Sequence, residues 1–309
     1  GRATPTPTPP PNPGNGSFVL HESTKSLAET MTGTAAFLGA SGDLIAGGGM
    51  TSASAEAAGA GGFAPFAAVG GSSLRHETGS HVNVRGMNLA VGFSREVMRG
   101  NDRILFGPIV EYGRGSYDSY LDDGTHGDGT SSYIGAGVVA ELAMRGGIRV
   151  DGTLRAGRTK SDYTGLASYD TSNAYYGIQV GAGKDFRVSE AAAVNAYVRY
   201  AYTHTAGASA YLSTGETYEF DAVNSHRLRL GTRYTHGMSA LSQFYAGLAW
   251  EYEFDGDARA TSQGDSALLE LGYRFAPKAD SRVSYDLNLS GWQGKRQGVT
   301  GGISVKWAF

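Results

Sequence analysis

Hydrophobic and polar side chains alternate along most of this chain, from Phe63 to Phe309. The last stretch shows the pattern best, because alternate positions on one side are apolar or glycine: Val299, Gly301, Ile303, Val305, Trp307 and Phe309. The intervening positions between Thr300 and Ala308 are small or polar. Successive side chains of a β-strand point to opposite faces. The pattern therefore predicts strands with one apolar and one polar face.

Stretches of this kind predict about twelve strands, an even number within the usual range for bacterial outer-membrane barrels. Their approximate positions are 63–76, 82–98, 102–117, 132–145, 148–162, 173–187, 191–205, 223–236, 242–254, 265–276, 281–292 and 297–309. Many run to about 12 residues or more, well above the five or six that are usual in soluble sheets. We therefore predict an all-β transmembrane fold, an antiparallel up-and-down β-barrel over residues 63–309, rather than a β-sandwich.

The predicted connections differ in length on the two sides of the barrel. Short turns rich in Gly, Asn, Asp and Pro alternate with longer polar segments at 117–131, 163–172, 206–222 and 255–264. Bacterial outer-membrane barrels have short periplasmic turns and longer extracellular loops, so the lengths fit the same class.

The segment 17–50 has a helical period, because its weakly apolar positions recur every three or four residues: Leu20, Thr24, Leu27, Met31, Ala35, Leu38, Gly42 and Ile45. The positions between them are mostly Ser, Thr, Ala, Glu or Lys. Such a thin apolar face suits a narrow polar tunnel. A barrel of about twelve strands is too wide to be filled by its own side chains, so we expect this helix inside the lumen as a plug. The alternative is that residues 18–50 pack outside the barrel or stay disordered in the absence of a membrane.

Two further segments complete the predicted organisation. Residues 1–16 hold most of the prolines and favour an extended linker, the end of a passenger or its tether. Residues 51–62 are a Gly/Ala-rich connection between the helix and the first strand. No signal peptide opens the sequence, so we expect the C-terminal part of a longer precursor.

Composition narrows the function classes without naming one. The 309 residues contain no cysteine, which fits a bacterial cell-envelope chain. The net charge of −3 gives no support for a nucleic-acid partner. Mean hydropathy is −0.26, as expected when half of each strand faces water. No cofactor, metal or catalytic motif is predicted, and no Gly-x-Ser-x-Gly sequence occurs.

One acidic segment, 122–128, offers a weaker alternative as a site. His126 is flanked there by carboxylates that could orient it as a base in a surface hydrolase. The same carboxylates could bind Ca²⁺, although their spacing matches no established calcium loop. We favour the plainer interpretation of a solvated, glycine-rich loop.

Charged side chains on the polar faces are predicted to line the pore or contact the helix: Glu111, Glu141, Arg155, Arg199, Arg229, Arg233, Glu251, Glu253, Glu270, Arg274 and Lys306. Arg149, Asp151, Arg227 and Asp286 fall on the same faces. An Arg or Lys turned into lipid would cost up to about 2–4 kcal/mol at mid-membrane, so these charges fix the register. We expect them to form ion pairs that hold the barrel and its plug; contact with a translocating segment is the alternative.

Several stretches together resemble the translocator (β) domain of monomeric autotransporters, the type V secretion proteins of Gram-negative bacteria. They are Lys25–Glu29 and Gly42–Ile45 in the helix, and Phe63–Ala67, Gly86–Gly92 and Leu105–Tyr112 in the first three strands. The order of linker, helix and barrel agrees with the family over nearly the whole chain.

The resemblance implies an integral outer-membrane protein that contacts outer-membrane lipid and lipopolysaccharide. It also implies that the β-barrel assembly machinery reads an assembly signal in Trp307 and Phe309. A passenger before residue 1 would reach the cell surface, and the helix would be left plugging the pore. Some relatives then cut between two asparagines of the helix. Residues 18–50 contain no Asn-Asn, so we expect the passenger to stay attached or to be cut by another protease.

We predict no enzymatic activity, and a monomer, because a closed barrel has no sheet edge left to pair. The main alternative function is a small diffusion porin. A porin has no reason for a proline-rich tether and a plug helix before its first strand, so we favour the autotransporter.

Overall fold

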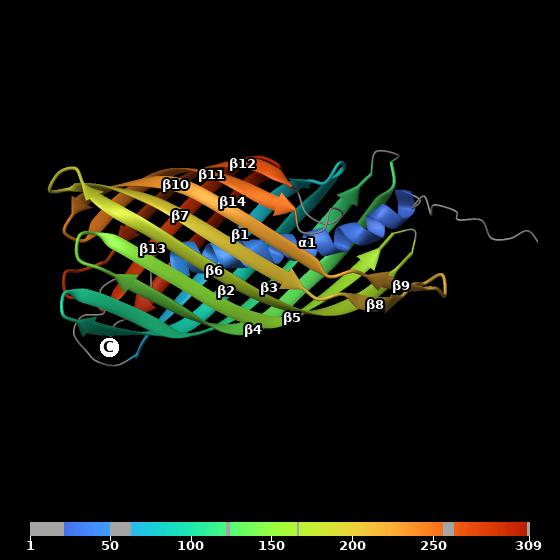
Figure 1. The fold of residues 1–309 in the computed structure, drawn as a ribbon, viewed down its shortest axis with the longest axis horizontal. Coiled ribbons are helices and arrows are strands. Elements are labelled where there is room, and N and C mark those ends of the chain that lie inside the picture. Colours follow the sequence, from blue (N-terminus) through green and yellow to red (C-terminus); the bar gives the residue numbers. More distant parts are fainter. Residues whose placement is uncertain (1–21, 50–62, 122–123, 166, 256–262, 308–309) are drawn as a thin grey trace, which may run out of the picture.

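The computed structural model describes residues 22–49, 63–121, 124–165, 167–255 and 263–307. Twelve antiparallel strands close into a barrel in the order β1-β14-β13-β12-β11-β10-β7-β6-β5-β4-β3-β2. This confirms the predicted fold class (Figure 1). The strands are β1 (Phe63–Glu77), β2 (His81–Arg99), β3 (Asp102–Tyr120), β4 (His126–Ala143), β5 (Ile148–Thr164), β6 (Tyr169–Arg187), β7 (Ala192–Thr205), β10 (Val223–Ser239), β11 (Ser242–Asp255), β12 (Gly264–Phe275), β13 (Val283–Gly294) and β14 (Arg296–Trp307).

The two ends of the barrel differ. At the turn end, β2 joins β3 at Gly100–Asn101 and β10 joins β11 at Ala240–Leu241. At the loop end, β7 joins β10 through a separate hairpin, β8 (Ala208–Tyr211) and β9 (Thr217–Phe220). This hairpin projects beyond the barrel rim in Figure 1.

Three of the four predicted loop-end connections were too long, whereas the one at 255–264 agrees with the ends of β11 and β12. The segment predicted as a loop at 117–131 is mostly strand, because β3 and β4 stay paired out to Tyr120 and His126. Likewise β5 and β6 stay paired out to Tyr163 and Tyr169, and 206–222 contains β8 and β9. These strands continue past the apolar zone, where the hydrophobic alternation that marks a strand in the sequence fades.

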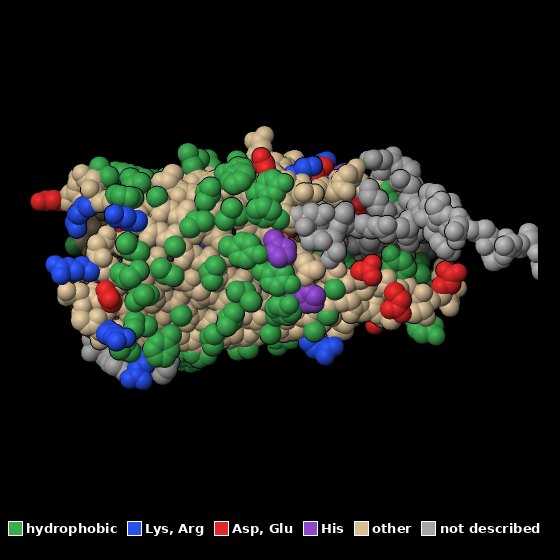
Figure 2. Space-filling model, viewed as in Figure 1, with side chains coloured by type: hydrophobic (Ala, Val, Ile, Leu, Met, Phe, Trp, Pro, Cys, Tyr) green, Lys and Arg blue, Asp and Glu red, His purple; other side chains and the backbone are tan. Residues whose placement is uncertain are grey.

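The outer wall is apolar. Large hydrophobic side chains are exposed on it at alternate positions, among them Met87, Val110, Ile134, Leu154, Leu248 and Ile303. Figure 2 shows such side chains spread over the barrel wall, with most charged side chains toward its two ends. An exposed apolar wall of this extent is what a lipid-facing surface requires.

The helix α1 (Glu22–Leu44) lies inside the lumen and continues into a π-helical turn at Ile45–Gly49. Its N-terminal part is near the loop end, where Glu29 contacts Thr78 and Ser80. Ile45 packs in a buried cluster with Phe66 and Leu105, nearer the turn end. This confirms the predicted helix inside the barrel. No helix in the described part of the chain has both the length and the hydropathy needed to cross a bilayer.

Candidate functional site

The site is the interface between α1 and the inner wall, and its loop-end part is built from hydroxyl groups. Glu29 is fully buried, and its carboxylate accepts hydrogen bonds from Thr78 Oγ1 (3.0 Å), Ser80 Oγ (2.7 Å) and Ser119 Oγ. A buried carboxylate is costly unless it is hydrogen-bonded, and these three donors come from the barrel. The contacts therefore hold this part of α1 close to the rim.

The wall also contacts Thr30, directly after Glu29, and Thr34, one turn further along. The Thr30 hydroxyl lies 3.0 Å from Tyr117 OH and accepts a hydrogen bond of 2.5 Å from Tyr169 OH. Thr34 Oγ1 lies 3.1 Å from Ser161 Oγ. These contacts are neutral, so the hydroxyl groups of Thr30 and Thr34 are satisfied here without charge.

Phe37 is the main apolar anchor of the helix. Its side chain is 1% exposed and lies against the wall at Gly86 and Gly115. A Cβ at either glycine would approach the Phe37 ring to 2.2 Å. The wall therefore needs glycine at these two positions to receive the ring.

A network around Glu111 binds the middle of the helix. Ser41 Oγ donates to Glu111 Oε2 (2.6 Å), and Tyr175 OH donates to Glu111 Oε1 (2.5 Å). The Arg155 guanidinium bridges this carboxylate at 3.1 Å and donates 2.5 Å to the carbonyl of Leu38. Both charged side chains are nearly fully buried. The pair thus fixes the wall to both a side chain and the backbone of α1.

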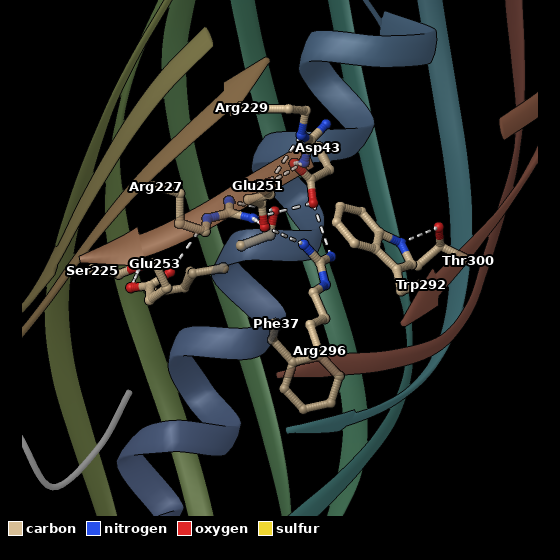
Figure 3. A network of polar contacts seen from close by, with 12 residues as sticks. Phe37, Asp43, Ser225, Arg227, Arg229, Glu251, Glu253, Trp292, Arg296 and Thr300 are labelled. Atoms are coloured by element: carbon tan, nitrogen blue, oxygen red, sulfur yellow. Dashed lines mark hydrogen bonds and ion pairs between the residues drawn. The ribbon is translucent and has the colours of Figure 1, made fainter. Parts of the chain in front are cut away.

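Asp43 is the centre of a second, larger network (Figure 3). Its carboxylate forms ion pairs with Arg229 (2.8 Å), Arg296 (2.8 Å) and Arg227 (3.4 Å). Arg227 also donates 3.4 Å to the carbonyl of Gly39. One helix residue is therefore held by three arginines, which come from β10 and from the first position of β14.

The same arginines are shared with wall carboxylates. Glu251 pairs with Arg229 (2.7 Å) and, at 3.5 Å, with both Arg227 and Arg296. Glu253 accepts a hydrogen bond of 2.7 Å from Ser225 and lies 4.0 Å from Arg227. Three carboxylates thus face three guanidiniums, and Asp43 is the one carboxylate of this balanced set that belongs to the helix.

An aromatic ring completes the network. The Arg296 guanidinium lies over the Trp292 ring at 3.8 Å from its centroid, and that of Arg229 lies at 5.1 Å. Cation–π contact of this kind strengthens when the cation is removed from water. It holds both arginines in place beside Asp43.

The other pore-lining residues predicted from sequence pair with one another on the inner wall. Arg199 pairs with Asp151 (2.9 Å), Arg233 with Glu270 (2.7 Å), Arg274 with Asp286 (2.6 Å), and Glu141 with Arg103 (3.4 Å) and Arg149 (3.7 Å). Lys306 is buried on the inner face of β14. The predicted set thus divides into residues that bind α1, directly or through a shared partner, and residues that brace the wall.

The structure describes the side chains of three of the five predicted plug residues. Leu20 lies outside the described residues, and at Leu27 only the helical backbone is described. Met31, Leu38 and Ile45 are all buried.

Several residues of the interface were missed: Glu29, Thr30, Thr34, Phe37, Ser41 and Asp43 on the helix, and Arg296 on the wall. Phe37 and Asp43 lie off the helical stripe, and Arg296 falls between two predicted strands. A charged residue in an otherwise small, neutral stretch was the available signal for Asp43.

Two predictions concern residues outside the lumen: the assembly signal at Trp307 and Phe309, and the acidic segment around His126. Trp307 lies on the outward face of β14 and is 36% exposed; Phe309 lies outside the described residues. His126 stacks on Tyr120 with 4.7 Å between ring centroids, and its Nδ1 is 3.1 Å from the carbonyl oxygen of Ser119. Of the acidic segment beside it, residues 122–123 lie outside the described part.

Below the helix, the lumen is open at the turn end. A cavity of about 540 Å³ is lined there by Arg187, Arg274, Tyr285 and Asp286, among others. The helix therefore fills the loop-end and middle parts of the polar lumen, and the described residues leave a cavity at the turn end.

Comparison with known proteins identifies the class. The autotransporter beta-domain family matches residues 65–304. The chain belongs to this family. As an autotransporter β-domain it is a translocator domain, and it is integral to the outer membrane. No relative was found among curated protein sequences.

Solved autotransporter domains share the fold. The translocator domain of NalP from Neisseria meningitidis is 14% identical with a TM-score of 0.74, covering 92% of this chain and 99% of that one. The β-domain of the Bordetella autotransporter BrkA is 18% identical with a TM-score of 0.69, covering 80% and 99%. The transport unit of AIDA-I from Escherichia coli is 11% identical with a TM-score of 0.64, covering 87% and 99%.

Proposed function

We propose that this barrel carries a passenger segment attached before Gly1 to the cell surface, and that α1 then stays in the lumen as its plug. The observation that supports this most is the direction of the helix. Glu29 lies at the loop end and Ile45 nearer the turn end, so a chain entering α1 comes from the loop end. If the loops face outward, as in other outer-membrane barrels, the passenger side is the cell exterior.

The test of export uses the full chain with a signal peptide and an epitope-tagged segment before Gly1. Protease added to intact cells should remove the epitope and leave the barrel intact. An epitope that is cut only after the outer membrane has been permeabilised would overturn the proposal. A band of unchanged size in untreated cells would support a passenger that stays attached, as the lack of Asn-Asn in residues 18–50 suggests.

The plug is tested separately by electrical recording in planar bilayers. The channel should be nearly closed in the full chain and should conduct when residues 17–50 are deleted. The balanced network around Asp43 and the buried ring of Phe37 support this, since both hold α1 inside the lumen. Equal conductance of the two proteins would refute the proposal that α1 plugs the lumen, but it would not bear on the proposal of passenger export.

We further propose that β14 and its aromatic residues Trp307 and Phe309 are recognised by the β-barrel assembly machinery. The support is that β14 closes the barrel against β1 and presents Trp307 on its outer face. Deletion of Phe309 should lower the amount of folded barrel in the outer membrane. Phe254→Ala, which removes an exposed aromatic from β11, is the matched control and should assemble normally; equal loss in both would contradict the proposal.

A further inference from the structure

Four basic side chains stand on the lipid side of the barrel, unlike the paired charges of the lumen. They are Arg85 on β2, Arg114 on β3, and Arg158 and Lys160 on β5, all exposed. We call them the basic band. Among the described residues, none of the four makes an ion pair or a hydrogen bond. A cation turned toward hydrocarbon is costly, so the presence of these four cations on the outer wall calls for an anionic partner or a position outside the hydrocarbon layer.

Strand register brings the basic band together. Arg114 pairs with Ser132, and Ser132 pairs with Lys160, so these three residues form one row across β3, β4 and β5. With neighbouring strands about 4.8 Å apart, the two cationic positions are about 10 Å apart along the sheet. Arg158 lies two residues before Lys160 on the same face of β5, toward the turn end. Arg85 pairs with Ser116, which lies two residues after Arg114 on β3, toward the loop end.

The band lies at a border between two kinds of surface. On its turn-end side the wall is apolar: Val138 and Leu154, which pair with each other, are 51% and 53% exposed. On its loop-end side the sign of the charge reverses: Asp118 pairs directly with Asp128, and Asp162 with Asp170. Directly opposed like charges are unfavourable neighbours, and they would repel an anion. On β3 to β5, the row of Arg114, Ser132 and Lys160 therefore lies between apolar and acidic surface and is the part of this wall that favours an anion.

We propose that the basic band binds the phosphate groups of one lipopolysaccharide molecule in the outer leaflet. This rests on the proposed orientation, with the loop end outside. A phosphorylated glycolipid would place its acyl chains on the apolar wall and its phosphates at the level of the band. Arg85, Arg114 and Arg158 supply guanidiniums that match phosphate geometry, and Ser132 adds a hydroxyl between Arg114 and Lys160.

The test measures lipid binding to the purified full chain in detergent by native mass spectrometry. The probes are diphosphoryl lipid A, chemically dephosphorylated lipid A and phosphatidylglycerol. The double variant Arg114→Gln/Lys160→Gln is compared with Arg99→Gln/Arg145→Gln, which removes two exposed cations near the turn end. Folding of all proteins is checked by their heat-dependent mobility on gels, so that a misfolded variant is recognised.

Diphosphoryl lipid A should bind the wild type and the turn-end variant alike, and bind the band variant at least tenfold more weakly. Added salt should weaken the difference, because exposed charges are screened. Equal binding by the band variant, equal binding of dephosphorylated lipid A, or equal binding of phosphatidylglycerol would each overturn the proposal. Purified protein and lipid suffice for this assay, so its failure is distinct from a failure of passenger export.

Discussion

The substitution Asp43→Asn tests how the plug is held. The variant keeps the size of the side chain and removes one charge from a set of three carboxylates and three guanidiniums: Asp43, Glu251, Glu253, Arg227, Arg229 and Arg296. Removing one partner of a buried ion pair typically costs about 3–5 kcal/mol. The Asp43 side chain is 17% exposed, and asparagine still offers an acceptor. We therefore expect the helix-bound state to lose about 2–3 kcal/mol relative to the released state.

Such a loss has a measurable size. At about 1.4 kcal/mol for each factor of ten, the released state should become about 30- to 140-fold more populated. The assay is the open probability of single channels in planar bilayers. Glu270→Gln is the control, because Glu270 pairs with Arg233 on the wall (2.7 and 3.0 Å). The reasoning is refuted if Asp43→Asn opens no more often than the wild type, or if the control opens as often as Asp43→Asn.

Two other substitutions test packing. Phe37→Ala should raise the open probability in the same assay, because a buried Phe→Ala change costs about 3–5 kcal/mol. The control Phe106→Ala removes a ring from the outer wall and should leave the open probability unchanged. An unchanged open probability for Phe37→Ala would contradict the role of Phe37 as an anchor. Gly272→Ala should lower the melting temperature of the barrel, since its Cβ would lie 1.8 Å from the Tyr245 ring and overpacking costs about 1–3 kcal/mol. Gly291→Ala, with no atom within 4 Å, should melt like the wild type; equal melting of the two variants would show that the ring adapts freely.

The barrel could be predicted from sequence because two solvents act on each strand. Lipid outside and water inside select opposite residues at alternate positions, as in Leu269 and Glu270 or Ile303 and Ser304. The strand number and the facing of the inward charges follow from that alternation. The loop-end strand limits could not be predicted, because beyond the lipid both faces of a strand are polar. At Tyr117–Tyr120 the strand continues, but the hydrophobic contrast that would mark it is gone.

The helix interface could be predicted only in part. A helical stripe marks a residue as buried when a helix has one covered face, whereas the barrel covers α1 on all sides. Glu29, Thr30, Phe37 and Ser41 are therefore as buried as Met31 and Leu38, although none of the four lies on the predicted stripe. Which wall residue meets which helix residue depends on the depth and rotation of α1, and neither leaves a periodic trace in the sequence.

The charges of the inner wall agree with the direction of α1. The end of a helix that carries its last carbonyls has a partial negative charge and favours nearby cations. In this barrel Arg155 and Arg227 donate to the carbonyls of Leu38 and Gly39, and Arg229 and Arg296 lie one turn further along at Asp43. The loop-end part of the helix meets hydroxyl groups instead. A helix threaded in the opposite direction would bring its partially positive end to this cluster of arginines, so the charges of the inner wall favour the observed direction of α1.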